Sequence, residues 1–216
     1  MISTIFLDND GVLVDTEKYY FEANMETSRR YGYELTLEEY RRLFLAEGTG
    51  MRDVADRLGW SDEHFAGYRA ERDALFYRLV TTREIVLPGV AEGLALLKSR
   101  FDLCIVTSCH RQLFDAVHRR TGFGRFFSRV VSEESVKRHK PHPEPYLTAM
   151  AIMRVTPEGC MAIEDSERGL RSAADAKLSC IIVPCEMTRD QIFTRADFVA
   201  ASFLDAVDKI AKEMKS

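Results

Sequence analysis

The stretch that decides the fold is Thr4-Ile5-Phe6-Leu7-Asp8-Asn9-Asp10-Gly11. Its first half is a short run of apolar and β-branched residues, which predicts a buried strand over 4–7. Two acids follow at once, and a glycine then permits a tight turn. Because alternate side chains of an extended chain share one side, Asp8 and Asp10 are expected to face the same way. Alone, the stretch predicts only a strand and an acidic turn.

Four further apolar segments predict buried strands, and helical patterns separate most of them. The strands are expected at Leu103–Thr107, Phe126–Val131, Met161–Glu164 and Cys180–Val183. The helices are expected at Val90–Arg100, Arg111–Thr121, Glu144–Met153, Ser166–Ala176 and Phe203–Lys215. Continuous apolar strands that alternate with helices indicate a parallel sheet covered on both faces. The predicted fold class is therefore α/β, with a doubly wound parallel sheet.

Residues 15–83 interrupt this alternation. They contain amphipathic helical stretches at Glu17–Tyr31, Leu37–Leu45, Met51–Leu58 and Asp62–Val80, and no clear strand. A crossover of that length without its own structure is unusual in a compact domain. We therefore expect a small helical domain over 15–83, inserted into a core formed by 1–14 and 84–216.

Composition narrows the classes of function. The net charge of −4 argues against a general nucleic-acid binder, and no apolar run approaches the ~20 residues that span a membrane. The first residues lack the basic lead of a signal peptide, so a cytoplasmic location is the expectation. The five cysteines form no Cys-x-x-Cys pair, which favours reduced thiols over disulfides or a zinc site. We expect a monomer.

Chemistry-bearing side chains follow four of the five predicted strands. Besides the two acids after the first strand, they are Thr107-Ser108, Lys140 and Glu164-Asp165. Ligands of open parallel sheets gather outside the carboxyl ends of the strands. Carboxylates crowded there repel one another unless a cation joins them, and ligands that are all oxygen suit Mg²⁺. A lysine and a threonine hydroxyl would neutralise and hydrogen-bond phosphate oxygens.

The two acids after the first strand could divide the work of phosphoryl transfer. Asp8 would attack phosphorus as a carboxylate nucleophile. Asp10 would protonate the leaving oxygen and then activate the second nucleophile. Gly11 would let backbone N–H groups approach the phosphate.

Four segments resemble, in order, the four motifs of the haloacid dehalogenase superfamily. They are Asp8–Glu17, Ile105–Ser108, Lys140–Tyr146 and Ala162–Ser166 together with Gly169. The helical insertion resembles the cap of the subfamily that contains β-phosphoglucomutase and phosphoglycolate phosphatase. The resemblance covers nearly the whole chain and implies a Rossmann-like core with a helical cap domain.

The resemblance also implies roles for individual residues. Asp8 would form an aspartyl-phosphate, and Thr107 and Lys140 would hold phosphate oxygens, with Ser108 and Gly11 close by. Mg²⁺ would be held by Asp8, the backbone carbonyl of Asp10 and Asp165, with Glu164 assisting in an outer position or through water. True dehalogenases of the superfamily lack the second acid of the first motif, so Asp10 favours phosphate chemistry.

The expected activity is hydrolysis of a small phosphorylated metabolite. Mutase relatives carry a histidine shortly after the first motif and a Gly-x-Ser-Arg cap loop; Glu17–Phe21 has no histidine and Gly48–Arg52 departs from the loop pattern. A sugar-phosphate mutase is the first alternative. The second is a non-catalytic phospho-acceptor or signalling module, although no acid closes the third strand, where Val130-Val131-Ser132 stands. The substrate stays open between a sugar phosphate, phosphoglycolate, a nucleotide and a small organophosphate.

The histidines carry no predicted role in this chemistry. His110, His118, His139 and His142 are all expected on the surface.

Overall fold

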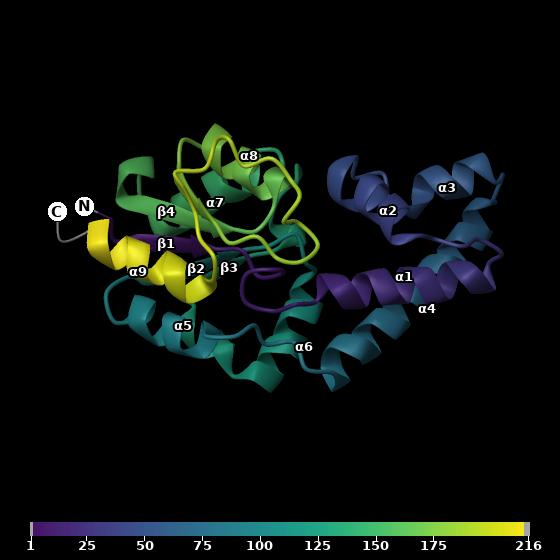
Figure 1. Cartoon of the computed structure of the whole chain (residues 1–216), viewed down its shortest axis with the longest axis horizontal. Helices are drawn as coiled ribbons and strands as arrows, with labels where there is room; N and C mark the ends of the chain where they lie inside the picture. The colour runs from purple at the N-terminus through teal and green to yellow at the C-terminus, as the bar shows by residue number, and fades with distance from the viewer. Residues whose placement is uncertain (1, 214–216) are drawn as a thin grey trace. The chain divides into compact units, whose positions relative to one another are not determined.

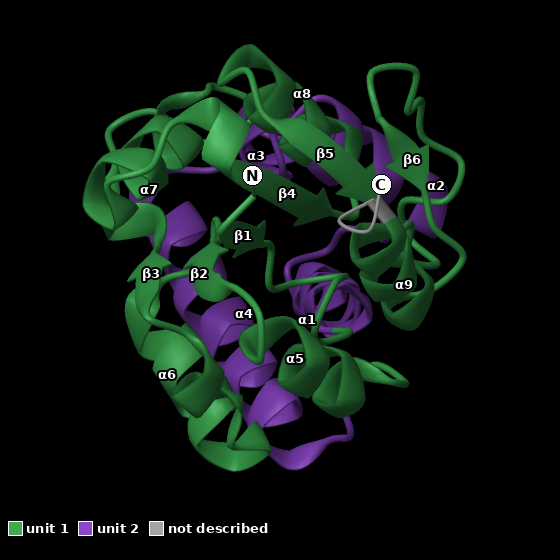
Figure 2. Cartoon of the chain, turned by 90° about the vertical axis from the view of Figure 1, so that its left-hand side faces the viewer, with its two compact units in different colours: residues 1–15, 85–216 green, residues 16–84 purple. Residues whose placement is uncertain are grey.

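Six parallel strands form one sheet (Figure 1), and Figure 2 shows their order, β3-β2-β1-β4-β5-β6. Their bounds in this computed structural model, which describes residues 2–213, are β1 Thr4–Leu7, β2 Asp102–Val106, β3 Arg129–Val131, β4 Cys160–Glu164, β5 Ser179–Ile182 and β6 Phe198–Val199. The predicted doubly wound α/β sheet is confirmed. β1 lies between β2 and β4, so the acidic stretch follows the centre of the sheet.

The sheet belongs to the first of two compact units, which comprises Met1–Asp15 and Ile85–Ser216. The second unit is the insertion Thr16–Glu84 (Figure 2). Where the first unit is interrupted, its two chain ends lie side by side: the Asp15 N–H donates to the Ile85 carbonyl oxygen at 2.7 Å.

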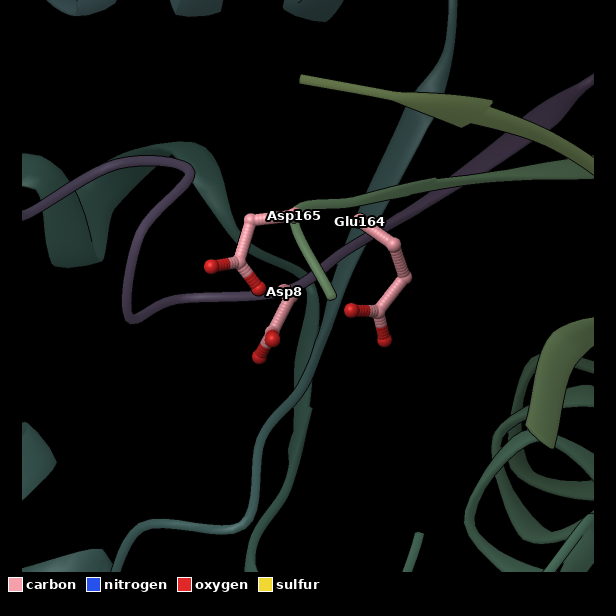
Figure 3. Close-up of side chains that lie close together, drawn as sticks. All are labelled: Asp8, Glu164 and Asp165. Atoms are coloured by element: carbon pink, nitrogen blue, oxygen red, sulfur yellow. The ribbon is translucent and has the colours of Figure 1, made fainter. Parts of the chain in front are cut away.

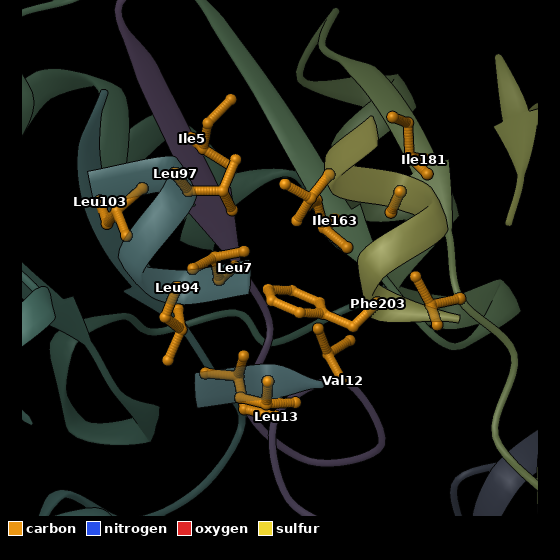
Figure 4. Packing of buried hydrophobic residues seen from close by; sticks show 14 of the residues in the cluster. Ile5, Leu7, Val12, Leu13, Leu94, Leu97, Leu103, Ile163, Ile181 and Phe203 are labelled. Carbon is orange, nitrogen blue, oxygen red and sulfur yellow. The ribbon is translucent and has the colours of Figure 1, made fainter. Parts of the chain in front are cut away.

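Alternate residues of each strand fill two separate apolar layers. On β1, Ile5 and Leu7 belong to one layer and Phe6 to the other. The first layer packs against α6 Arg111–Thr121. It also packs against α5 Val90–Lys98 and α9 Phe203–Glu213, as Figure 4 shows. The second packs against α7 Glu144–Met153 and α8 Glu167–Asp175. Both faces are covered, which is why the strands read as continuous apolar runs.

The second unit contains only helices among its described elements. They are α1 Glu17–Arg30, α2 Leu37–Tyr40, a π-helical turn Arg41–Ala46, α3 Met51–Arg57 and α4 Asp62–Thr82. Thr36 begins α2 with a capping box to Glu39, and the Ser61 hydroxyl accepts the His64 N–H at the start of α4. Tyr40, Leu43 and Tyr68 are fully buried in the unit's own core.

Three sequence-based expectations need correction. The third strand begins at Arg129, because Phe123–Phe126 forms a 3-10 turn instead of the start of a strand. The two-residue strand β6 was not expected, and Lys215 of the predicted last helix lies outside the described residues. His118 is buried, with 4% of its surface exposed, and not on the surface as expected.

All five cysteines are free thiols. Among residues 2–213, no helix is long and apolar enough to cross a membrane.

Candidate active site

The register of the sheet brings three strand ends level with one another. Leu7 of β1 pairs with Ile105 of β2 on one side and Ile163 of β4 on the other. Asp8 directly follows Leu7 and Glu164 directly follows Ile163, and their carboxylates converge with that of Asp165 (Figure 3). Each offers a carboxylate oxygen, and the three oxygens lie within 4.8 Å of one another. β2 continues one residue further, to Val106, so its polar contribution begins at Thr107.

Lys140 is the cation at the centre of this group. Its Nζ lies 3.2 Å from Asp8 Oδ1 and 2.6 Å from Glu164 Oε1, and it donates to the Val106 carbonyl oxygen at 2.7 Å. The lysine side chain is 5% exposed. Burial alone would lower the pKa of Lys140, but Asp8 and Glu164 raise it above its ordinary value, so the ammonium stays charged.

The Asp8 carboxylate is fixed by its neighbour as well as by the lysine. The Asn9 backbone N–H donates to Asp8 Oδ1 at 2.7 Å. Burial, followed by the negative charge of Glu164, raises the pKa of Asp8 to about 7, although Lys140 opposes the shift. Both donors act on Oδ1.

Glu164 is completely buried against a glycine. Its Oε1 accepts the Tyr146 hydroxyl at 2.5 Å in addition to the Lys140 contact. Its Oε2 has no hydrogen-bond partner among residues 2–213. A Cβ at Gly169 would lie 1.9 Å from that Oε2, so only glycine leaves space for the carboxylate.

Asp165 is oriented by a loop that follows β5. The Thr188 hydroxyl and the Cys185 thiol each lie 3.3 Å from Asp165 Oδ2. Burial raises the pKa of the Cys185 thiol to about 12, so it stays protonated and donates. Gly11 has φ +80, and a Cβ there would lie 2.2 Å from Asp165 Oδ2. The turn after β1 can approach Asp165 only because residue 11 is glycine.

The second strand end contributes a hydroxyl. Thr107 Oγ1 donates to Asp10 Oδ2 at 3.3 Å and accepts the Cys109 N–H at 3.0 Å. Ser108 is exposed. The structure thus brings Asp8, Asp10, Thr107, Lys140, Glu164 and Asp165 into one cluster, whereas it gives Ser108 no side-chain contact in that cluster.

The acidic residues fit a magnesium ion. Two buried carboxylates and a third with an unpaired buried oxygen form an all-oxygen donor set, which a hard cation prefers. Mg²⁺ takes one or two carboxylates readily and completes its shell with water and substrate oxygens. Lys140 and Tyr146 both engage Glu164 Oε1, and Glu164 Oε2 packs against Gly169, so Asp8 and Asp165 are the better candidates for direct ligands.

Four residues of the site were given no role from sequence: Asn9, Tyr146, Cys185 and Thr188. Each acts through a contact with a residue distant in sequence or through its backbone, and no local pattern marks such contacts.

The burial of His118, in contrast, could have been predicted. This histidine stands one helical turn after the buried Phe114, so the spacing of α6 could have placed it on the buried face.

Comparison with known proteins gives a family model and several relatives that match most of this chain. A family model described as "Haloacid dehalogenase-like hydrolase" matches residues 5–183. A phosphorylated carbohydrates phosphatase of Thermotoga maritima is 32% identical over 186 residues, covering 83% of this chain and 84% of the relative. Protein CbbY of Rhodobacter capsulatus is 31% identical over 208 residues, covering 91% and 92%.

A solved structure extends the likeness to three dimensions. A variant of CbbY from Rhodobacter sphaeroides in complex with xylulose-(1,5)bisphosphate aligns with a TM-score of 0.82 at 30% identity, covering 94% of this chain and 95% of that chain. Because the family model covers most of the sequence and relatives above 30% identity cover most of its length, the chain is a member of the haloacid dehalogenase-like hydrolase family.

Proposed function

We propose that this protein is a magnesium-dependent phosphatase that removes phosphate from a small phosphorylated sugar through an aspartyl-phosphate on Asp8. The observation that carries the proposal is the contact of one buried ammonium, Lys140, with Asp8 at 3.2 Å, beside the second acid pair Glu164-Asp165. The names of the phosphorylated carbohydrates phosphatase and of the bisphosphate complex support a sugar phosphate as substrate.

In the first half-reaction, Asp8 Oδ2 attacks phosphorus while the bond from phosphorus to the sugar oxygen breaks. Asp10 gives its proton to that leaving oxygen, and the alcohol departs. Thr107, which donates to Asp10 Oδ2, holds this carboxyl in place. Lys140 neutralises charge on the phosphate oxygens beside Asp8.

In the second half-reaction, Asp10 is a carboxylate and takes a proton from water. The water oxygen bonds to phosphorus as the bond to Asp8 breaks, which releases inorganic phosphate and restores both aspartates. Asp8 and Asp165 would hold the magnesium ion, with the carbonyl of Asp10 as a further ligand. When bound, the ion supplies positive charge that offsets the repulsion between carboxylates and phosphate.

The proposal is tested by phosphate release from xylulose 1,5-bisphosphate and from a panel of sugar monophosphates with Mg²⁺. Asp8→Asn should lower kcat by at least about a thousandfold, because loss of a covalent nucleophile removes the reaction path. Asp102→Asn is the matched control, since its carboxylate is 65% exposed at the start of β2 and should leave kcat unchanged. Substantial magnesium-dependent turnover by Asp8→Asn would refute the assignment, and an isomerised sugar phosphate without free phosphate would indicate a mutase.

A further inference from the structure

Asn9 holds the turn between the two acids in place. Its backbone N–H donates to Asp8 Oδ1, and its carbonyl oxygen accepts the N–H groups of Leu13 and Val14 at 2.9 and 3.2 Å. The side chain is also buried, with 1% of the residue exposed. A movement of Asn9 would therefore shift the nucleophile and the turn that carries Asp10.

The side chain of Asn9 is anchored by a histidine on α6. His118 Nε2 lies 2.7 Å from Asn9 Oδ1, and His118 Nδ1 lies 3.0 Å from Thr121 Oγ1. With the amide oriented as in the structure, its oxygen can only accept, so Nε2 carries the proton. Nδ1 then accepts the Thr121 hydroxyl proton, and the Thr121 oxygen in turn accepts the Phe123 N–H at 3.2 Å. Both ring nitrogens are satisfied in one tautomer.

Three phenylalanine rings also surround the imidazole. The rings of Phe114, Phe127 and Phe123 have centroids 4.3, 5.9 and 6.2 Å from that of His118. An apolar residue would fill such a cage without a polar group to satisfy, so a packing role alone does not require histidine. A hydrogen bond to Asn9 does explain why the cage holds a polar donor.

We propose that His118 is a positioning residue for the nucleophile, because it fixes Asn9, and Asn9 fixes the Asp8–Asp10 turn. The assignment of Asp8 as the nucleophile rests on the proposed phosphatase function. The hydrogen bonds of His118 go to Asn9 and Thr121, not to Asp8 or Asp10. Its removal should therefore reduce the population of correctly placed nucleophile and lower kcat, while leaving the phosphate-binding groups and KM largely intact.

Three variants separate this role from a contribution to stability alone. His118→Leu keeps an apolar volume but removes the donor, and should lower kcat about tenfold or more with KM changed less than about threefold. His118→Gln, whose amide nitrogen can reach the same oxygen, should recover most of the lost kcat. Phe114→Leu is the matched control, because it loosens the same cage one turn away without removing the hydrogen bond, and should keep wild-type kcat.

A second measurement does not depend on activity. Amide hydrogen exchange is measured at Leu13 and Val14, whose N–H groups donate to the Asn9 carbonyl oxygen. Under conditions in which the two variants have the same free energy of unfolding, exchange at these amides should be faster in His118→Leu than in Phe114→Leu. Wild-type kcat and wild-type exchange in folded His118→Leu would overturn the proposal. If the wild type hydrolyses no phosphate ester, the proposed function fails, and the exchange experiment still decides whether His118 positions the turn.

Discussion

Gly169→Ala should destabilise this protein although it places alanine, the best helix former, in α8. The added Cβ would lie 1.9 Å from Glu164 Oε2 and 2.1 Å from its carboxyl carbon, so the carboxylate must move. Moving it disrupts the contacts of Glu164 Oε1 with Lys140 at 2.6 Å and Tyr146 at 2.5 Å.

The two opposing effects can be compared in size. Alanine in a helix gains about 1 kcal/mol over glycine. Disrupting a buried, hydrogen-bonded ion pair costs about 3–5 kcal/mol. The second effect is larger, and the free energy of unfolding should fall by about 2–4 kcal/mol, which lowers Tm by roughly 5–15 °C.

Urea unfolding followed by circular dichroism measures this change, with Gly159→Ala as the matched control. A Cβ at Gly159 meets nothing within 4 Å, so that variant should be unchanged or up to about 1 kcal/mol more stable. In a Glu164→Ala background the Gly169→Ala penalty should vanish, because no carboxylate is left to displace. Gly169→Ala as stable as the wild type, or equal penalties in both backgrounds, would refute the reasoning.

Three other outcomes follow from the site and its surroundings. Burial lowers the pKa of His118 from 6.5 to about 4, so on acidification the unfolded chain takes up this proton before the folded chain does. The free energy of unfolding should therefore hold its full value above pH 6.5 and fall by about 3 kcal/mol as the pH drops to 4. Urea unfolding at each pH measures this loss, which should be missing in His118→Leu. Lys140→Ala should weaken binding of inorganic phosphate at least about tenfold by calorimetry and lower kcat, because the ammonium beside Asp8 is lost; unchanged phosphate affinity would contradict its role. Chelation of divalent ions should abolish turnover, and Mg²⁺ should restore it. Because loss of an outer-shell partner already costs at least about tenfold in metal affinity, loss of the proposed direct ligand in Asp165→Asn should raise the Mg²⁺ requirement by at least that factor. Activity that survives the chelator would exclude the magnesium requirement.

Much of the site could be predicted because it is encoded locally. The strand over 4–7 and the acids after it lie within eight residues, and the continuous apolar strands that alternate with helices indicate a sheet covered on both faces. Parallel strands place their carboxyl ends at one edge, so the grouping of Asp8, Thr107 and Asp165 follows once the order of elements is known. The short strand β6 offered too few residues for any pattern to be detected.

Other contacts could not be predicted because they join residues that only packing brings together. The spacing of α6 could have indicated that His118 is buried, but no local pattern indicates that it reaches Asn9, 109 positions away in the chain. In the sequence, nothing near Tyr146 indicates a partner for its hydroxyl. In the folded protein this hydroxyl donates to Glu164 Oε1 of β4 at 2.5 Å.

The sequence by itself determined the order of strands and helices, the inserted helical segment and the identity of the acids, lysine and hydroxyl, because hydrophobic period and residue type are local properties. Only the tertiary structure decided that Lys140 joins Asp8 to Glu164, that Gly169 and Gly11 make space for carboxylates, and that His118 contacts Asn9. Most of these contacts join residues that are far apart in sequence. They depend on loop conformation and on how side chains pack on both faces of the sheet, and therefore on the fold of the whole unit.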